Sequence, residues 1–542
     1  MVLARMRARL RSKLAMPAIG VLLAGVCTAQ TGDVVHFNGP VTQGDTNRYT
    51  VTGSVSNSVT GEPVRRALVH LGQFSAFSGA DGRFQIDGVT AGQYNATAQR
   101  PGFFDPAQTG SGPYPSMISV GPNTPAISLK LLPESAIEGR VLSNTGEPIE
   151  NAQVQVISEQ IANGRKTLQS TGNDATDDAG DFRIENLMPG KYYVQVLQQP
   201  VFGFANLLGS GAPNREVYPE EFYPNAPDIG SAQALDVKPG EAARVDFTLS
   251  PKTSFRISGT ITPSAPNGIF ATLQDTSGEE TQVGIQFHPQ TGRWMLPSVP
   301  PGAWTLVFRA QNQPGDAYYA EQRIDVRGSD IENVQIVLQP LPPIPVQVVN
   351  APESGAQSVQ VQLMPRSGRL NSQQFMAAPQ SGNASGALFL RDVTPGVYNV
   401  AVQSNGQSCI ESVMSGAVDL AHDPLVISAG SPPPPIQVSL RQDCATLDVT
   451  VQSQDHAGMT GLILVTDSQA FQPKIAFVPP GAHMSFGPLT PGVYRLYATA
   501  NPNNLEYSNP EAMRNIDGQE ITLAPNQQAT ASVTIPGSAA NQ

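Results

Sequence analysis

Residues 182–192 read Phe-Arg-Ile-Glu-Asn-Leu-Met-Pro-Gly-Lys-Tyr, and this pattern recurs four more times along the 542-residue chain. In every copy a large apolar residue stands seven places before a Pro-Gly pair (Ala-Gly in the first copy), and an aromatic residue follows three places after the Pro or Ala. The copies begin at Phe84, Phe182, Trp294, Leu388 and Met484. Their glycines, at positions 92, 190, 302, 396 and 492, lie 94 to 112 residues apart, so the repeating unit has the size of a domain.

The pattern predicts a β-hairpin. Proline fixes φ near about −65° at the second position of a turn, and the following glycine supplies the positive φ of a type II turn. The next strand alternates, as in Tyr192-Tyr-Val-Gln-Val196, which indicates one buried face. The upstream apolar residue is expected on the partner strand, filling the same core, so Trp294 and Trp304 are expected to be packing residues. The hairpin residues are Gly92 and Tyr94; Pro189, Gly190 and Tyr192; Pro301, Gly302 and Trp304; Pro395, Gly396 and Tyr398; and Pro491, Gly492 and Tyr494.

Further strands accompany each copy. Every copy closes with an alternating strand such as Ile127-Ser-Leu-Lys-Leu131, and the first three open with a strand that has glycine at its centre, as in Val51-Thr-Gly-Ser-Val55. About seven short strands per roughly 95 residues, without helical periodicity, predict an all-β chain of five tandem seven-stranded β-sandwiches, Ig-like or prealbumin-like. The expected boundaries are a polar lead-in at 30–44 and sandwiches at 45–132, 133–250 (with a long aromatic loop), 251–340, 341–441 and 442–537.

The first two copies resemble the carboxypeptidase regulatory-like domain. The resemblance rests on the turns Thr60-Gly-Glu-Pro63 and Thr145-Gly-Glu-Pro148, on Asp81-Gly-Arg-Phe84 and on the Pro-Gly pattern itself. It is weaker in the third copy and weakest in the last two. It implies a transthyretin-like (prealbumin-like) sandwich, often grouped with carbohydrate-binding-like folds, of the kind found as tandem modules in bacterial exported proteins. Such a resemblance identifies a fold better than a ligand.

The beginning of the chain is typical of a secretory signal peptide, expected at residues 1–29. Five basic residues between Arg5 and Lys13 precede an apolar run that ends at Val26, just before Cys27. Two alternatives are a retained membrane anchor and lipoprotein processing at Cys27, although Val26 stands where a lipobox has a small residue. The expected location is therefore secreted, periplasmic or at the outer surface, with no membrane-spanning helix in the mature chain.

Composition and motifs argue against several functions. The formal net charge is −12 and only 14 % of residues are charged, which is unsuited to a nucleic-acid partner. In metallocarboxypeptidases the resembling domain follows a zinc catalytic domain, but the five copies leave no room for one. The sequence has no His-x-x-Glu or His-Glu-x-x-His zinc pair, no Gly-x-Ser-x-Gly elbow and no phosphate-binding loop of the Gly-x4-Gly-Lys-Ser/Thr type. No enzyme activity and no cofactor are expected.

Removal of the signal peptide would leave two cysteines, Cys409 and Cys444, 35 positions apart. An even number in an oxidising compartment predicts a disulfide. The alternative is a pair of buried free thiols.

Two groups of residues are candidate sites. Asp174, Asp177, Asp178 and Asp181 crowd one loop, where clustered carboxylates can bind Ca²⁺ or simply form a turn. The long loop of the second copy carries Tyr218, Phe222 and Tyr223 beside carboxylates, which is typical of a sugar-binding platform. The alternative is that these rings fold back over the sheet edge. Other copies have aromatic residues in the same loop, at Phe103, Phe104, Tyr114, Tyr318, Tyr319 and Tyr507, and Phe204 precedes the second copy's set.

The sequence thus predicts a non-enzymatic exported binding module on the cell surface or in the periplasm, with carbohydrate as the first candidate ligand. Its partner would be a glycan or a cell-envelope protein. The alternative functions are a structural or adhesive stalk and an accessory subunit of an outer-membrane transporter or peptidase system.

Overall fold

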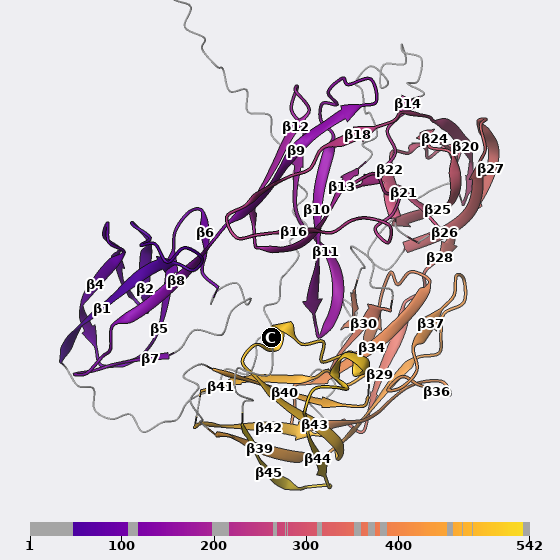
Figure 1. Ribbon diagram of the computed structural model, residues 1–542. Helices are drawn as coiled ribbons and strands as arrows, with labels where there is room; N and C mark the ends of the chain where they lie inside the picture. Colours follow the sequence, from indigo (N-terminus) through magenta and orange to yellow (C-terminus); the bar gives the residue numbers. More distant parts are fainter. Residues whose placement is uncertain are drawn as a thin grey trace, which may run out of the picture. The chain divides into compact units, whose positions relative to one another are not determined.

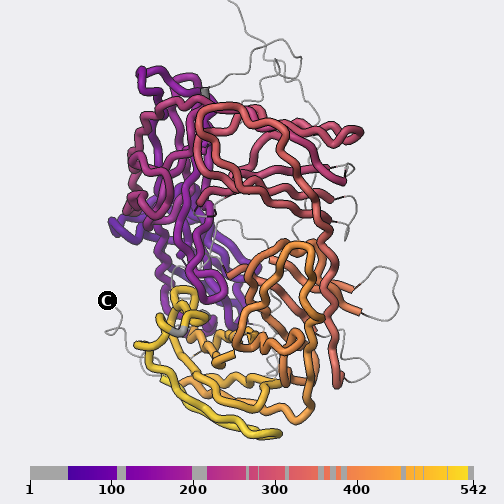
Figure 2. Tube along the Cα trace, turned by 90° about the vertical axis from the view of Figure 1, so that its right-hand side faces the viewer, coloured from indigo at the N-terminus to yellow at the C-terminus, as the bar shows by residue number. Residues whose placement is uncertain are grey.

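In the computed structural model strands are almost the only regular secondary structure of the described residues, which confirms the all-β prediction (Figures 1 and 2). Its helices, within the described residues, are η2 (Pro502–Asn504) and α2 (Pro510–Met513), and no described helix is long and apolar enough to cross a membrane. The structure describes residues 47–106, 117–197, 216–263, 268–276, 278, 280–311, 317–351, 359–366, 374–379, 387–452, 459–468, 470–479 and 481–534. The predicted signal peptide, lead-in and Cys27, together with Tyr114 and Phe204, lie outside them.

We number the expected sandwiches as blocks 1 to 5. The described residues of block 1 form eight strands in two sheets, where seven strands were expected. In spatial order these are β4 (Arg83–Thr90), β1 (Arg48–Asn57), β8 (Ile127–Pro133) and β6 (Phe103–Phe104), then β3 (Phe74–Phe77), β2 (Leu68–Leu71), β5 (Gly92–Gln99) and β7 (Met117–Val120).

Blocks 2 and 3 repeat this two-sheet arrangement with additional short strands. One sheet of block 2 has β11 (Arg165–Ala175), β10 (Gln153–Ala162), β13 (Gly190–Leu197) and β15 (Glu221–Phe222), with β16 (Leu235–Val237) also on β13. The second has β12 (Asp181–Leu187), β9 (Ser135–Ser143), β17 (Ala242–Arg244) and β18 (Phe247–Leu249). A further short strand of block 2, β14 (Glu216–Val217), pairs with β19 (Lys252–Thr253) at the start of block 3. Block 3 has β23 (Gln286–His288), β24 (Arg293–Val299), β20 (Phe255–Thr262) and β27 (Ile331–Val337), then β22 (Glu280–Val283), β21 (Ile269–Gln274), β25 (Gly302–Gln311), β26 (Ala317–Val326) and β28 (Gln339–Pro340).

Blocks 4 and 5 have the same plan. Block 4 has β32 (Ala378–Pro379), β33 (Leu388–Leu390), β29 (Ile344–Val349), β38 (Ile436–Arg441), β35 (Cys409–Ser415) and β36 (Val418–Asp419), then β31 (Phe375–Met376), β30 (Val359–Pro365), β34 (Gly396–Ser404) and β37 (Leu425–Ile427). Block 5 has β42 (His483–Leu489), β39 (Ala445–Gln452) and β45 (Gln528–Thr534), then β41 (Lys474–Val478), β40 (Thr460–Thr466), β43 (Gly492–Thr499) and β44 (Gln519–Leu523).

Buried hydrophobic side chains of the described residues form five larger clusters, and these follow the five blocks. Two residues cross an expected boundary, because Ala470 lies in the block 4 cluster and Phe471 packs against it. We propose that each cluster, enclosed by its two sheets, is the core of one sandwich.

The predicted hairpin is wrong in all five blocks. The strands on either side of the Pro-Gly turn belong to different sheets: β4 pairs with β1, whereas β5 pairs with β2 and β7. The same holds for β12 and β13, β24 and β25, β33 and β34, and β42 and β43. Gly92 and Gly492 have φ 159°, Gly302 has 150°, and Gly190 and Gly396 have no positive φ, so none is near the value of about +80° that a type II turn needs. The Pro-Gly pair produces a sharp bend, but which strands pair is decided by the burial of the apolar faces of the two strands that the bend connects.

The turn is instead a corner between sheets, closed by the aromatic residue that follows it. The hydroxyl of Tyr494 donates to the carbonyl of Thr490 over 2.7 Å, and that of Tyr398 to the carbonyl of Thr394 over 2.8 Å. Trp304 Nε1 donates to the carbonyl of Pro300 over 3.0 Å. The hydroxyls of Tyr94 and Tyr192 likewise bond to Thr90 Oγ1 and the Met188 carbonyl. In every block the polar tip therefore reaches four residues back across the glycine, as in the tyrosine corner of other sandwiches.

We expect Tyr494→Phe to lower the free energy of unfolding of block 5 by about 1 kcal/mol, because it removes a buried hydrogen bond while keeping the ring. Burial raises the pKa of Tyr494 to about 12, so the hydroxyl keeps its proton and the loss should be the same at pH 7 and pH 9. Amide hydrogen exchange of block 5 in the intact chain measures it. The control is Tyr497→Phe on the same strand, whose hydroxyl makes no hydrogen bond to any described residue. If the two variants lose equal amounts of protection from exchange, the hydrogen bond of the corner does not stabilise block 5.

The glycine in the opening strand faces the large residue that begins the repeated pattern. Gly53 pairs with Phe84, Gly139 with Phe182 and Gly259 with Trp294. In blocks 4 and 5 the same position is valine, and its partner is aliphatic: Val346 pairs with Leu388 and Val449 with Met484. The two landmarks of the sequence are therefore cross-strand neighbours that compensate each other in volume. All five large residues contact the core, Met484 partly buried and the others buried.

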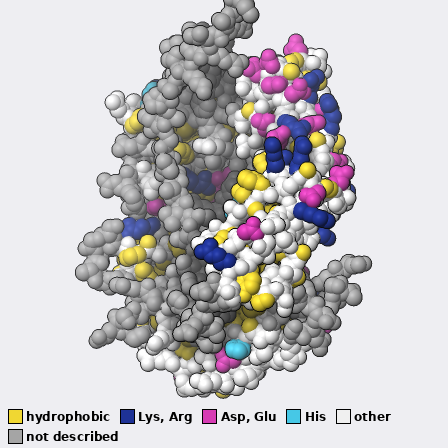
Figure 3. All heavy atoms as spheres, turned by 90° about the vertical axis from the view of Figure 1, so that its left-hand side faces the viewer, with side chains coloured by type: hydrophobic (Ala, Val, Ile, Leu, Met, Phe, Trp, Pro, Cys, Tyr) yellow, Lys and Arg dark blue, Asp and Glu magenta, His cyan; other side chains and the backbone are white. Residues whose placement is uncertain are grey.

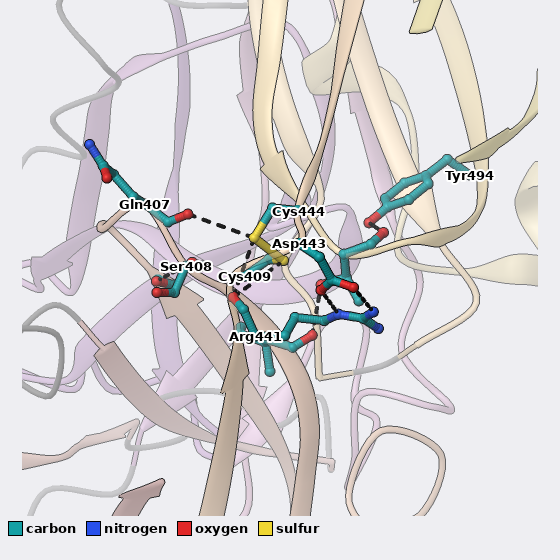
Figure 4. Close-up of a disulfide and its surroundings, with 10 residues drawn as sticks. Gln407, Ser408, Cys409, Arg441, Asp443, Cys444 and Tyr494 are labelled. Carbon is teal, nitrogen blue, oxygen red and sulfur yellow. Dashed lines mark hydrogen bonds and ion pairs between the residues drawn. A yellow bond between two sulfur atoms is a disulfide. The ribbon is translucent and has the colours of Figure 1, made fainter. Parts of the chain in front are cut away.

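The structure places a disulfide between Cys409 and Cys444, as expected from the sequence, with their Cα atoms 5.8 Å apart (Figure 4). Cys409 begins β35, and its cross-strand partner on β38 is Arg441. Cys444 follows β38 and directly precedes β39. Arg441 also holds Asp443 through Nε and Nη2, at 2.5 and 2.6 Å. The disulfide therefore ties the connection between blocks 4 and 5 to a strand of block 4.

Candidate functional site

The three aromatic residues expected to form an exposed platform in block 2 do not do so. Phe222 is 1 % exposed and lies in a small cluster with Ile157 and Ala226. Tyr218 and Tyr223 pack against the block 2 core, and Tyr223 meets Phe247 edge to face. The reason is that β15 adds to the sheet beside β13, which turns the loop inward. The alternative prediction, rings folded over the sheet edge, describes this arrangement.

The aspartates of block 2 are not brought together. Asp181 accepts from Arg140 Nε and Nη2 at 2.7 and 2.8 Å, and this hydrogen bonding keeps the pKa of Asp181 below its usual value. Asp177 accepts from two backbone amides of its own turn, and Asp174 accepts from the Arg183 amide. In the part of the chain that the structure describes, no group of three or more His, Cys, Asp or Glu side chains is placed to bind a metal ion.

On the face in Figure 3, Lys and Arg lie interspersed with Asp and Glu.

A cavity of about 700 Å³ lies at one end of the second sheet of block 1. Its floor is a row across three strands, because Phe77 pairs with Leu68 and Leu68 pairs with Gln99. The chain after β5 then turns back to form a wall that includes Phe103 and Phe104. The remaining lining residues are Arg66, Ala98, Arg100, Pro101 and Asp105.

Two interactions fix this wall. Asp105 Oδ2 accepts from the Ala98 amide over 2.9 Å, which anchors the loop to β5. β6 pairs with β8 of the other sheet, where Phe103 lies opposite Pro133. Phe103 and Phe104 are therefore half-buried and held, whereas Phe77 is 67 % exposed. The cavity is thus lined by the held rings of Phe103 and Phe104 and by the exposed ring of Phe77.

The cavity also has two cationic groups. Neither the Arg66 nor the Arg100 guanidinium forms an ion pair or hydrogen bond with another described residue. Arg66 has φ 55°, in the left-handed region, and it is the one described non-glycine residue with positive φ that is neither Asn nor Asp. At the matching place of block 2 stands Asn151, with φ 60°. The backbone amide of Arg66 donates to the carbonyl of Ser78, and that of Asn151 donates to the carbonyl of Thr176, both over 2.9 Å.

Asparagine tolerates this backbone better than arginine does. Strained positions cluster at functional sites, so an arginine there favours a role for its side chain. The sequence had indicated Phe103 and Phe104 but not Arg66, Arg100 or Phe77. The alternation in β3 was the available signal: Phe74 and Ala76 face the core, which places Phe77 on the outer face.

Comparison with known proteins supports the family resemblance for part of the chain. Residues 50–111 and 136–250 match the family model of the carboxypeptidase regulatory-like domain, which confirms that prediction for blocks 1 and 2. This is a non-catalytic type of domain. No curated protein matches the chain.

Several solved structures are similar to the chain at low identity. The TIE protein of Bacillus anthracis is 14 % identical over 53 % of this chain and 50 % of its own, with a TM-score of 0.17, so this chain spans half of its length. A streptococcal ancillary pilin is 10 % identical over 54 % of this chain and 99 % of its own, with a TM-score of 0.19. The minor pilin of Streptococcus agalactiae is 12 % identical over 37 % of this chain and 95 % of its own, with a TM-score of 0.21.

Proposed function

We propose that the chain, which carries carboxypeptidase regulatory-like domains in its first two blocks, is a non-enzymatic exported protein that binds carbohydrate in the block 1 cavity. The supporting observation is the combination, in one cavity, of the exposed ring of Phe77 with two guanidinium groups that have no partner among the described residues. Aromatic faces stack on the apolar faces of sugar rings, and polar groups beside them give direction.

The cationic groups narrow the ligand class. A guanidinium is a planar donor that matches the geometry of a carboxylate. With Arg66 and Arg100 on one cavity, we infer a preference for acidic sugars such as uronates over neutral ones. The protein's net charge of −12 opposes anions at long range, so binding should rest on these local contacts.

The test is an array of neutral and acidic oligosaccharides probed with the mature protein. Arg66→Asn should abolish or weaken binding at least tenfold, about 1.4 kcal/mol, while leaving the fold intact or more stable, because asparagine suits φ 55°. Phe77→Ala should weaken binding as well. The matched control is Phe270→Ala in block 3, which removes a ring that is 61 % exposed but lies outside the cavity.

Unchanged binding in both cavity variants would contradict the proposal. An array without signal from the wild-type protein would also contradict it and would favour the stalk. Equal losses in Phe270→Ala and Phe77→Ala would place binding elsewhere.

A further inference from the structure

In every block the first and the last strand of more than two residues pair in parallel. In block 1, β1 and β8 pair from Gly53 with Ile127 to Asn57 with Leu131. The same relation holds for β9 with β17 and β18, β20 with β27, β29 with β38, and β39 with β45. The other strand beside each first strand, which precedes the corner, is antiparallel to it.

The last of these strands in one block is followed closely by the first of the next block, with only the two-residue strands β19 and β28 intervening between blocks 2 and 3 and between blocks 3 and 4. One residue, Glu134, separates β8 from β9, and residues 442–444 separate β38 from β39. A pull on the two ends of the chain therefore enters each block at the beginning of its first strand and leaves at the end of its last strand. The corner, the aromatic loops and the block 1 cavity lie off this path.

The direction of pairing decides how such a pull acts. In a parallel pair the entry and exit points are at opposite ends, so the force runs along the strands and loads the evenly spaced ladder hydrogen bonds together. In an antiparallel pair both points would lie at the same end, and the bonds would open one by one. We propose that this protein is a force-bearing tether and that the parallel first–last pair of each block is its mechanical clamp.

The clamps differ in length, and the one of block 4, which has the fewest residue pairs in total, has a reinforcement. The pairing of β39 with β45 spans seven residue pairs, whereas that of β29 with β38 spans four, from Val346 with Ile436 to Val349 with Ser439. Block 4 also carries the disulfide. Because Cys444 at its exit is bonded to Cys409 on β35, a pull there loads β35 and β38 together. The covalent bond thus supplements the four-pair ladder of block 4.

The experiment stretches the intact mature chain in a force spectrometer, with one handle at its N-terminus and the other on β45. Two positions on this strand are compared, Thr534 and Gln528, both exposed and both coupled through the same click-reactive side chain. At Thr534 the pull shears β39 against β45. At Gln528, which pairs with Thr446, it peels them from one end.

We expect one unfolding event, that of block 5, to lose most of its force when the handle moves from Thr534 to Gln528, while the other events stay unchanged as an internal control. Equal forces in the two geometries would overturn the clamp. Forced unfolding reports the unfolding rate, so the comparison uses one loading rate.

The disulfide has its own readout. Replacing both cysteines by serine should increase the length of chain released in one unfolding event, that of block 4, by about 120 Å. The reason is that the 35 positions closed by the disulfide, at about 3.3–3.6 Å per residue, then extend with the rest of the chain. The same event should occur at lower force. Lengthening without a loss of force would overturn the reinforcement and leave only the ladder as the clamp of block 4. Loss of ligand binding does not bear on either result, because the cavity is off the path.

Discussion

Gly259→Ala should lower the free energy of unfolding of block 3 by about 3 kcal/mol, the upper end of what overpacking costs. A Cβ at this position would lie 1.8 Å from the carbonyl oxygen of Val334, and 2.7 and 2.9 Å from the carbonyl carbon and nitrogen of the same residue. The obstacle is backbone of the closing strand rather than the end of a flexible side chain, so relief requires β20 and β27 to separate. The same approach occurs at Gly139, where the Val245 oxygen would be 1.6 Å away.

The effect can be measured in the intact protein, because both tryptophans of the chain, Trp294 and Trp304, are in block 3. Tryptophan fluorescence during urea unfolding therefore reports this block alone. For an m value of about 1–3 kcal/mol per molar, the midpoint should fall by about 1–3 M. The control is Gly268→Ala, whose Cβ would have no atom of a described residue within 4 Å, and the urea midpoint of this variant should stay the same or rise slightly. If the two variants behave alike, the close approach does not limit this residue.

The sequence predicted what depends on local pattern and burial. The closing strands, the opening strands with their glycines, and the core positions of Trp294 and Tyr398 all follow from periodicity, and all are found. What failed was strand partnership. A Pro-Gly bend joins either two strands of one sheet or two strands of opposite sheets, and only the long-range pairing of β24 with β20 decides between them. The parallel pairing of the first and last strands also depends on long-range contacts, and no local sequence pattern predicts it.

The candidate site was partly predictable for a similar reason. Exposure of an aromatic loop residue depends on whether its segment joins a sheet, and β15 buries Phe222 by doing so. Phe103 and Phe104 are held by pairing of β6 with β8, yet they still line a cavity because the sheet ends beside them. The strain at Arg66 is seen in the structure as a positive φ. Comparison of the aligned turns, with Arg66 where block 2 has Asn151, is the sequence signal that would have identified it.

Trp294→Ala should lower the free energy of unfolding of block 3 by about 3–5 kcal/mol, the usual range for removing a large buried aromatic side chain. Trp294 is 2 % exposed, packs edge to face on Phe308 with ring centroids 5.0 Å apart, and covers Gly259 on the neighbouring strand. Gly259 itself has no side chain that could fill the space left by the indole. The remaining Trp304 reports unfolding of block 3 in this variant.

Trp294→Phe separates the role of the ring from that of the indole N–H, whose Nε1 has no hydrogen-bond partner among the described residues. An unpartnered buried donor costs about 1–3 kcal/mol, so its removal should offset much of the lost volume. We expect this variant to lose about 1 kcal/mol or less, with a urea midpoint close to that of the wild type. A loss as large as that of Trp294→Ala would mean that the N–H has a partner, such as a buried water, and that the indole is retained for this bond. A small loss in both variants would instead show that block 3 closes over the gap, which contradicts the compensation between the opening-strand residue and its large partner.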